Sequence, residues 1–290
     1  GATTDGFAVV DISDPADPSL LVDERDPLAD RDPTLFDVYD VKLDHENDLL
    51  AVVGPANPVG SGVFKGLIVY DVSDPATPER VTVHRTEFFN HNCFAADGRV
   101  YLCGNAGDRN GVVIVDARSG EELGHWSIAE VDERWADVGS TLHDLTVHDG
   151  VAYLAHWDAG TWAVDVSDPT APELRAKVRG RDPEAFLEMT RAERRQEFSE
   201  PPGNDHFVAV DGTGALLAVG RHVPGFTAHA DQVPGPVDRP ALAVPRTPPE
   251  PLPAPRPPPP AAPRRAPPAP PPPASARGRL APAASPPPAP

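Results

Sequence analysis

The stretch Gly66-Leu-Ile-Val-Tyr-Asp-Val-Ser-Asp-Pro-Ala-Thr-Pro-Glu79 decides the fold of this 290-residue chain. Its first half is apolar at almost every position, which is typical of a β-strand buried on both faces. Asp74 and Pro75 then end the strand, because an Asp side chain can bond its own backbone in a turn and a proline cannot donate to a sheet. The segment therefore predicts a buried strand, a turn and a further extended strand.

The same pattern returns along the chain. Apolar strands that begin with Gly and end with Asp occur at 6–11, 111–116 and 160–165, and Ser-Asp-Pro follows two of them at 13–15 and 167–169. The intervals between the four terminal aspartates are 60, 45 and 49 residues. Repeats of this length are typical of the four-stranded blades of a β-propeller.

Each unit also has an earlier half that is typical of a hairpin. Residues 145–155 form two apolar runs around Asp149-Gly150, and residues 93–103 repeat them around Asp97-Gly98. Asp-Gly favours a two-residue hairpin turn, because that turn needs positive φ at both positions. Looser versions occur at 41–52 and 207–218. The sequence thus predicts an all-β fold, a β-propeller of four-stranded antiparallel blades with about four recognisable units and a partial fifth.

Residues 66–79 and 160–173 resemble the LVIVD repeat, and the resemblance covers about residues 6–220. That family consists of β-propellers in exported and cell-surface proteins of bacteria and archaea, including salt-loving archaea. The resemblance implies the fold and an extracellular or cell-surface location, but no reaction, because a fold does not fix a function. The third unit departs from the pattern, with Asp116-Ala-Arg-Ser-Gly120 in place of Ser-Asp-Pro, which predicts a different turn.

Composition divides the chain near residue 220. Residues 233–290 hold 25 of the 39 prolines and carry a charge of about +5. The net charge of the whole chain is −19, so residues 1–232 carry about −24. The Pro/Ala/Arg-rich tail has too few large apolar residues to fold, and we expect 221–290 to be disordered and 1–220 to form the propeller. Three origins stay open for the tail: a proline-rich stalk or interaction segment, a linker to an anchor, or a frame-shifted translation of GC-rich DNA.

The charge and hydropathy of the body exclude some classes of partner. An acidic surface argues against nucleic acid, because phosphates are held by clustered Lys and Arg. No apolar run reaches the roughly 20 residues of a membrane-spanning helix. Only three Lys stand against 22 Arg and 44 acidic residues. Such a balance keeps a protein soluble at high salt, and it favours a halophilic source.

Residues 182–200 interrupt the repeats. Asp182-Pro183-Glu184 predicts the start of a surface helix, with an N-cap and a proline in the first turn. One side of that helix is expected to pack on the propeller through Phe186, Leu187 and Met189.

The two cysteines, Cys93 and Cys103, flank the predicted Asp97-Gly98 turn. A cross-strand disulfide is one interpretation. Free buried thiols are the one we favour, because a disulfide needs a specific Cβ geometry.

Histidine supplies the candidate site. His91, His143 and His206 stand at the start of the first strand in three units, and Tyr39 takes that place in the remaining one. The first strands of a propeller line its central channel, so the three imidazoles are predicted to approach one another. Three His ligands can bind zinc or a similar divalent metal and leave a position open for water. The competing interpretation, which we favour, is that each His hydrogen-bonds a neighbouring turn.

Other residues offer weaker signals. Asp144 is placed to orient His143 as a general base, but no nucleophile stands at a defined spacing from the pair. The Asp-rich turns lack the ligand spacing of a calcium loop. Three tryptophans either line a ligand rim or pack between blades: Trp126, Trp157 and Trp162.

These observations lead to a ranked set of functions. The first is a non-enzymatic cell-surface or extracellular binding scaffold with a protein or a surface ligand as partner, because the repeat residues have structural roles and no G-x-S-x-G, Walker loop or C-x-x-C is present. The second is a metal-dependent enzyme that uses the three histidines. The third is a nonfunctional, frame-disrupted remnant.

Overall fold

A computed structural model describes residues 2–222, with gaps at 4–5, 32–34, 57–61, 137–140, 181–182, 191, 194–203, 212–213 and 215. The segment 223–290, which includes nearly all of the predicted disordered tail, lies outside the described residues. The elements of the described part are β1 (Ala2–Thr3), β2 (Gly6–Asp11), β3 (Ser19–Glu24), β4 (Asp40–Asp44), β5 (Leu49–Gly54), β6 (Gly66–Asp71), β7 (Glu79–Arg85), β8 (Cys93–Ala96), β9 (Arg99–Cys103), η1 (Gly107–Arg109), β10 (Gly111–Asp116), β11 (Glu122–Ser127), η2 (Ile128–Glu130), η3 (Glu133–Ala136), β12 (Asp144–His148), β13 (Val151–His156), β14 (Gly160–Asp165), β15 (Glu173–Arg179), α1 (Pro183–Glu188), β16 (Asn204–Val210) and β17 (Leu217–His222).

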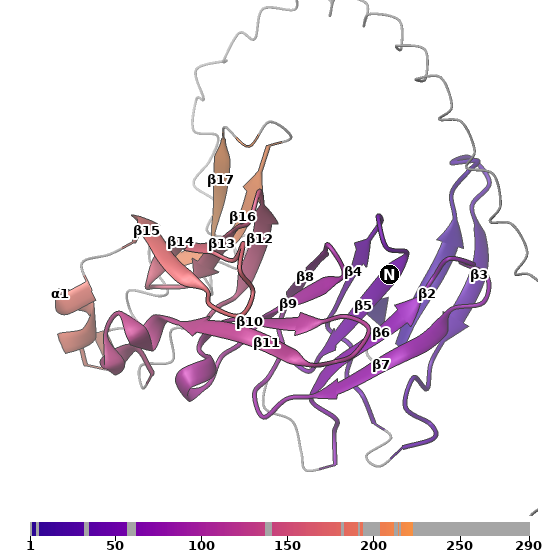
Figure 1. Ribbon diagram of the computed structural model, residues 1–290, viewed down its shortest axis with the longest axis horizontal. Helices are drawn as coiled ribbons and strands as arrows, with labels where there is room; N and C mark the ends of the chain where they lie inside the picture. The colour runs from indigo at the N-terminus through magenta and orange to yellow at the C-terminus, as the bar shows by residue number, and fades with distance from the viewer. Residues whose placement is uncertain are drawn as a thin grey trace, which may run out of the picture. The chain divides into compact units, whose positions relative to one another are not determined.

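The strands form five antiparallel sheets in chain order. Three sheets are complete blades of four strands: β4 to β7, β8 to β11 and β12 to β15. At one end lies the three-stranded sheet β1-β2-β3, and at the other the pair β16-β17. The first strands of successive blades, β4, β8, β12 and β16, are neighbours, so the sheets fan out from them (Figure 1). This arrangement confirms the predicted all-β propeller architecture.

The hairpin turns follow from their sequence. Asp97 and Gly98 have φ of 54° and 71°, and Asp149 and Gly150 have φ of 46° and 71°. Positive φ at two successive positions matches the right-handed twist of the strands that the turn joins. The predicted Asp-Gly turns are therefore confirmed.

The turn after each Gly-led strand is held by aspartate side chains. Oδ1 of Asp71 accepts a hydrogen bond from Ser73 N (3.1 Å), and Oδ1 of Asp74 accepts one from Ala76 N (3.0 Å). Asp165 and Asp168 repeat both bonds in the third complete blade. Because these carboxylates accept hydrogen bonds from their own turns, the predicted structural role of the aspartates is confirmed.

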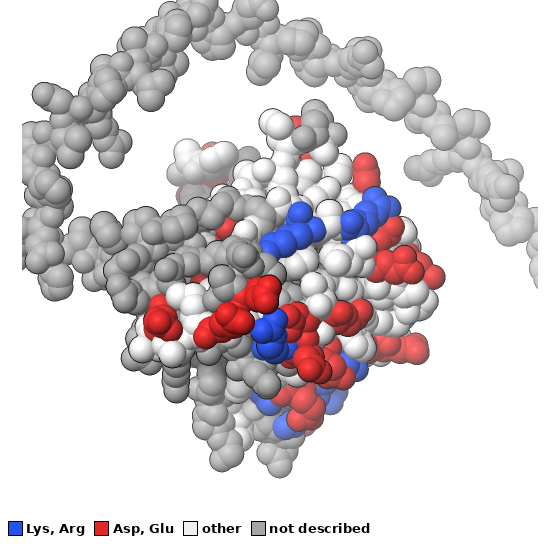
Figure 2. Space-filling model, turned by 90° about the vertical axis from the view of Figure 1, so that its left-hand side faces the viewer, with Lys and Arg blue, Asp and Glu red and all other residues white. Residues whose placement is uncertain are grey.

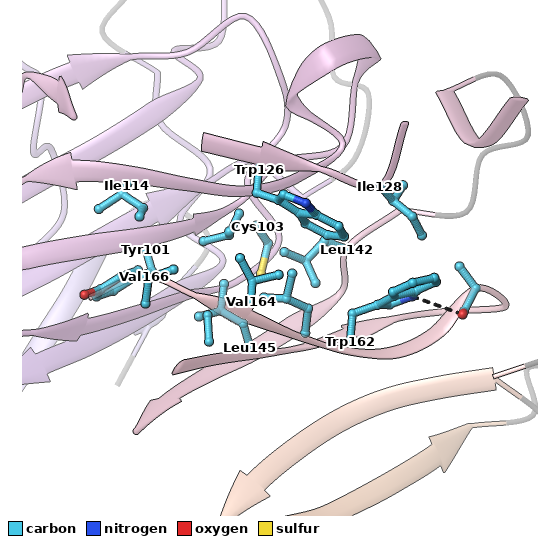
Figure 3. Packing of buried hydrophobic residues seen from close by; sticks show 14 of the residues in the cluster. Tyr101, Cys103, Ile114, Trp126, Ile128, Leu142, Leu145, Trp162, Val164 and Val166 are labelled. Atoms are coloured by element: carbon cyan, nitrogen blue, oxygen red, sulfur yellow. Dashed lines mark hydrogen bonds between the residues drawn. The ribbon is translucent and has the colours of Figure 1, made fainter. Parts of the chain in front are cut away.

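The core lies between the blades. Trp126 of β11 and Trp162 of β14 meet with ring centroids 6.3 Å apart, and the indole N–H of Trp162 donates to Ala159 O at 3.1 Å (Figure 3). Ile114 is fully buried in the same cluster as the two tryptophans, and Leu102 is fully buried in the adjoining cluster. Each such side chain stabilises the fold by about 1.5–3 kcal/mol, so the interfaces between blades dominate its stability.

The two cysteines are free and buried, as we favoured. Cys93 is opposite Leu102 in the β8–β9 ladder, not opposite Cys103. Their side chains belong to different clusters, Cys93 to the one shared with β5 and β6 and Cys103 to the one shared with β13 and β14. Side chains on opposite faces of one sheet cannot form a disulfide.

Helix α1 lies within the segment for which a surface helix was predicted, but it is only six residues long. Phe186 is buried and stacks on Trp135 with ring centroids 5.8 Å apart, while Leu187 and Met189 pack at the edge of the same cluster. In the part of the chain that the structure covers, no helix has the length and apolar character needed to cross a bilayer.

Candidate functional site

Four aromatic side chains pack against one another in a row where the inner strands begin. The ring centroids of Tyr39 and His91 are 5.1 Å apart, those of His91 and His143 4.1 Å, and those of His143 and His206 3.7 Å. We call this set the ring column. The structure thus brings the three sequence-predicted histidines together, in the order of the blades and with Tyr39 in the equivalent place.

Backbone bonds at the start of each inner strand place these rings. Tyr39 N donates to Val53 O and His143 N donates to Ala155 O, both at 2.9 Å, which extends the pairing of β4 with β5 and of β12 with β13. Nδ1 of His143 hydrogen-bonds the carbonyl oxygen of His206 at 2.7 Å. A carbonyl only accepts, so this Nδ1 carries a proton.

The aspartates that follow Tyr39 and His143 fix the stagger between neighbouring inner strands. Oδ2 of Asp40 accepts from Cys93 N on β8, and Oδ2 of Asp144 accepts from Val208 N on β16, each at 3.2 Å. Both bonds join a residue of one inner strand to the backbone of the next. Because the stagger is the same in each case, the preceding residues come level and their rings pack against each other.

Among the described residues of the inner strands β4, β8, β12 and β16, Lys42 is the one lysine or arginine. Its ammonium binds the carboxylate of Asp40 and donates to Oδ1 of Asn92 at 3.1 Å. Burial alone would lower the pKa of Lys42, but the hydrogen bond and charge of Asp40 raise it above its ordinary value. Lys42 therefore stays charged. Sequence reasoning did not single it out, although it is one of only three lysines in the chain.

Asp144 is a buried carboxylate. Burial raises its pKa to about 6, although the backbone bond from Val208 and the charge of Lys42 act in the opposite direction. Its hydrogen bond to β16 gives it a structural role in joining β12 to β16.

His91 completes the column with a neutral ring. Its Nδ1 is buried without a hydrogen-bond partner, and burial lowers the pKa of the imidazole. An imidazole that disfavours its charged form can stack on a neighbouring ring without charge repulsion.

The stacking bears on the metal hypothesis. Two imidazole nitrogens at about 2.0–2.1 Å from one zinc ion would keep their ring centroids roughly 5 Å apart. The measured separations are only 4.1 Å and 3.7 Å, with the ring planes tilted by 47° and 36°. Within the described ranges, no three His, Cys, Asp or Glu side chains are grouped to hold a metal ion. The present arrangement does not fit a shared metal, and binding by His91, His143 and His206 stays a prediction.

Trp157 extends the site, and the sequence could not distinguish it from the two other tryptophans. Its ring lies 4.6 Å from that of His143 and 5.3 Å from that of His206, whereas Trp126 and Trp162 are buried in the core. Its backbone has φ of 39°, in the left-handed region that bulky residues rarely adopt. A bridge to Asp205, with Asp205 N donating to Trp157 O at 3.1 Å, holds this loop against β16.

The fan of antiparallel four-stranded blades around a shared set of inner strands defines a repeat protein of the β-propeller class. Residues 2–23, 62–86 and 140–179 match the family described as LVIVD repeat. Three segments of the chain thus match the LVIVD repeat, which confirms the resemblance that 66–79 and 160–173 indicated. The unit that ends at Asp116, which lacks Ser-Asp-Pro, lies outside the matched segments.

The solved structures that the chain resembles share little sequence with it. Sqt1 of Saccharomyces cerevisiae is 12% identical, with 76% of this chain and 56% of that chain covered and a TM-score of 0.45. A chain of a nidogen/laminin complex is also 12% identical, with 71% and 60% covered and a TM-score of 0.39. The chain thus spans little more than half the length of these proteins. No curated protein sequence matches it significantly.

Proposed function

We propose that the chain is a non-enzymatic binding scaffold that presents the ring column and Trp157 to a protein ligand at the cell surface. The observation that carries the proposal is the left-handed backbone of Trp157, whose ring is held against His143 and His206. Such a conformation costs about 1–3 kcal/mol and persists where the surroundings impose it, most often at functional sites.

The exposure of the rings supports a binding surface. Tyr39 is exposed, and His91, His206 and Trp157 are half-buried, so several ring edges reach solvent while His143 anchors the column inside. Rings with an apolar body and a polar edge are enriched where proteins meet. The match to the LVIVD repeat is consistent with an interaction scaffold.

The blade surface carries charges of both signs. On the face shown in Figure 2, Asp and Glu gather in groups with Lys and Arg between them. Ion pairs also join neighbouring elements of the structure, such as Arg118 with Asp71 and Arg80 with Asp30. A partner that binds beside them meets a mixed surface in which acidic side chains outnumber basic ones.

A displayed library of random peptides tests the proposal. We expect peptides selected on the purified chain to lose binding when Tyr39 and Trp157 are both replaced by alanine. The matched control is Leu174→Ala, which removes an exposed apolar side chain from the outer strand β15. Equal binding of the selected peptides to both variants would contradict the proposal.

The location at the cell surface rests on the LVIVD resemblance and has its own test. An antibody raised against the folded chain should label intact cells of the source as strongly as lysed cells. Labelling that appears only after lysis would place the protein inside the cell and remove that part of the proposal.

The metal-dependent alternative rests on one observation, the convergence of three imidazoles on one site. It requires the rings to separate and turn their nitrogens to a common point. The divalent metal would be held by the side chains of His91, His143 and His206. Direct metal analysis decides between this alternative and the scaffold.

A further inference from the structure

Acidic residues adjoin the aromatic rings of the candidate site. An aspartate is the sequence neighbour of four of its five rings, in the pairs Tyr39-Asp40, His143-Asp144, Trp157-Asp158 and Asp205-His206. Lys42 is the one lysine or arginine among the described residues of the inner strands, and it is paired with Asp40. In these segments the aspartates therefore outnumber the cations. We propose that the ligand of this site is a positively charged side chain, Lys or Arg, presented by a partner protein.

The ring of Trp157 stands nearly perpendicular to the two imidazoles beside it. Its plane is inclined by 75° to the ring of His143 and by 87° to that of His206, with the centroids 4.6 Å and 5.3 Å away. Rings that meet in this way form the corner of an aromatic cage, the arrangement that holds quaternary ammonium groups and methylated lysine. A cation in this corner lies within about 6 Å of more than one ring centroid, the range over which an aromatic ring attracts it.

Trp157 is suited to this role by its exposure as well as by its chemistry. An indole attracts a cation more strongly than the other aromatic rings do. Three of the four tryptophans are buried, with exposed fractions of 1% for Trp126, 1% for Trp135 and 3% for Trp162. Trp157 is half-buried, so part of its indole reaches solvent while the histidines hold the rest. It is therefore the tryptophan that a partner can touch.

A buried carboxyl group is fixed to the loop that carries Trp157. Asp205 is 2% exposed, its backbone N–H donates to Trp157 O at 3.1 Å, and its Oδ2 accepts from Thr161 Oγ1 at 2.7 Å. Asp158 is half-buried and follows Trp157 directly. Charges away from bulk water interact more strongly than exposed ones, because the local dielectric constant is lower. These carboxyl groups therefore reinforce the attraction of a cation to the ring.

The lysines of the chain already make the contacts that the proposal assigns to a partner. Nζ of Lys65 lies 5.0 Å from the ring centroid of Phe89, and Nζ of Lys177 lies 5.2 Å from that of Trp162. Lys42, the third lysine, binds an inner-strand carboxylate. A cation over an aromatic ring and a cation on an inner-strand carboxylate are thus both compatible with this structure.

The charge of the body favours a basic partner over a neutral or an acidic one. Residues 1–232 carry about −24. A field of this sign steers a positively charged partner to the surface and repels a negatively charged one. The identity of the ligand rests on the binding function proposed above, to which it adds the chemical group that the rings recognise.

Peptides that differ in one kind of residue test the proposal. Dye-labelled peptides of Gly and Ser carry Arg, Lys or the neutral Arg analogue citrulline at the same positions, and their fluorescence anisotropy is followed as the full-length chain is added. The buffer contains about 0.15 M salt, which screens exposed charges more than about 8 Å apart. We expect the Arg peptide, the Lys peptide or both to bind at least about tenfold more tightly than the citrulline peptide. The relative affinities of the Arg and Lys peptides identify the preferred cation.

Variants of the chain locate the contact. Trp157→Leu removes the indole face and should weaken the binding of the cationic peptides about tenfold. Asp158→Asn should weaken it several-fold. The matched control is Asp149→Asn, which removes the same charge at the other end of β13, from a side chain that is 91% exposed, and should leave the affinity unchanged. Circular dichroism checks that each variant folds, and the citrulline comparison needs no substitution in the protein.

Several outcomes would overturn the assignment of a cationic ligand. Citrulline peptides that bind as tightly as the cationic ones, or no binding by any peptide, would do so. An unchanged affinity in Trp157→Leu, or an equal loss in Asp149→Asn and Asp158→Asn, would mean that the peptides bind the acidic surface as a whole. Displayed peptides that require Tyr39 and Trp157 but no Lys or Arg would also overturn it, while the binding scaffold itself would stand.

Discussion

The rings of His143 and His206 pack together with centroids 3.7 Å apart and planes tilted by 36°, and the imidazole of His143 also donates a hydrogen bond to the backbone carbonyl of His206 at 2.7 Å. The same side chain therefore joins β12 to β16 in two ways. One contact depends on the shape of the ring and the other on its proton, and substitution can separate them.

We predict that His143→Phe keeps the stacking and loses the hydrogen bond. The free energy of unfolding should fall by about 0.5–1.5 kcal/mol, as for one intramolecular hydrogen bond. His143→Ala loses both contacts and leaves a cavity in a buried site, so it should cost about 2–4 kcal/mol. Urea unfolding of the two variants measures the difference. Equal losses would mean that the stacking contributes nothing.

Asp144→Asn should stabilise the protein near neutral pH. The pKa of Asp144 is raised to about 6, against an ordinary value near 4, so the folded state holds its proton more tightly than the unfolded state. Ionisation above pH 6 therefore reduces stability. The amide keeps an oxygen that accepts from Val208 N and carries no charge.

The pH profile distinguishes an effect of the Asp144 charge from an effect that does not depend on pH. The variant should match the wild type below about pH 4, gain between pH 4 and 6, and exceed it by about 2–3 kcal/mol above pH 6. Asp40→Asn is the control, because Asp40 has Lys42 as its partner and the change should destabilise the protein. A constant difference between Asp144→Asn and the wild type at all pH values would contradict the assignment.

The sequence could predict the features that depend on residues close together in the chain or on the repeat. The turns at Asp71 and Asp165 and the hairpin at Asp97-Gly98 depend on residues two or three positions apart, so their pattern predicted them. The adjacency of the three histidines followed from their equivalent places in the repeat. Both inferences need only local chemistry and the periodicity of the chain.

The remaining features depend on contacts between blades. Lys42 meets Asn92 across 50 positions, and Asp40 meets Cys93 across 53. The repeat does not fix the stagger of one inner strand against the next, so neither the pairing of Lys42 nor the burial of Asp144 was visible in the sequence. The left-handed backbone of Trp157 depends likewise on β16, which begins far along the chain.

Asp165→Ala should weaken the turn of the third complete blade. Asp165 accepts from Ser167 N and Oγ and from the guanidinium of Arg175, and the Ser167 bonds and Arg175 lower its pKa to about 2. Its stabilising contribution is present above about pH 4 and is lost as the pH falls towards 2. Asp165→Asn keeps an acceptor for Ser167 and should lose less at pH 7. If urea midpoints show equal losses for the two variants, the turn hydrogen bonds contribute little.

Added salt should stabilise the folded body. Residues 1–232 carry about −24, and the repulsion between like charges is screened over about 10 Å at 0.1 M salt and about 3 Å at 1 M. The thermal midpoint should therefore rise steadily as sodium chloride increases from low to molar concentration. Sucrose at matched osmolality is the control for exclusion effects. Full stability in dilute buffer would count against a halophilic source.

The ring column gives a definite expectation for zinc. Its imidazole centroids lie closer together than a shared ion allows, and Nδ1 of His143 carries a proton that it donates to His206 O. Titration of the metal-free chain should therefore show no stoichiometric zinc at micromolar concentration, and His91→Ala should leave the metal content unchanged. The control is His45→Ala, on the exposed turn after β4. One zinc per chain that disappears separately with His91→Ala, His143→Ala and His206→Ala, but persists in His45→Ala, would show that the rings separate to bind metal. That result would establish the metal-dependent alternative over the scaffold.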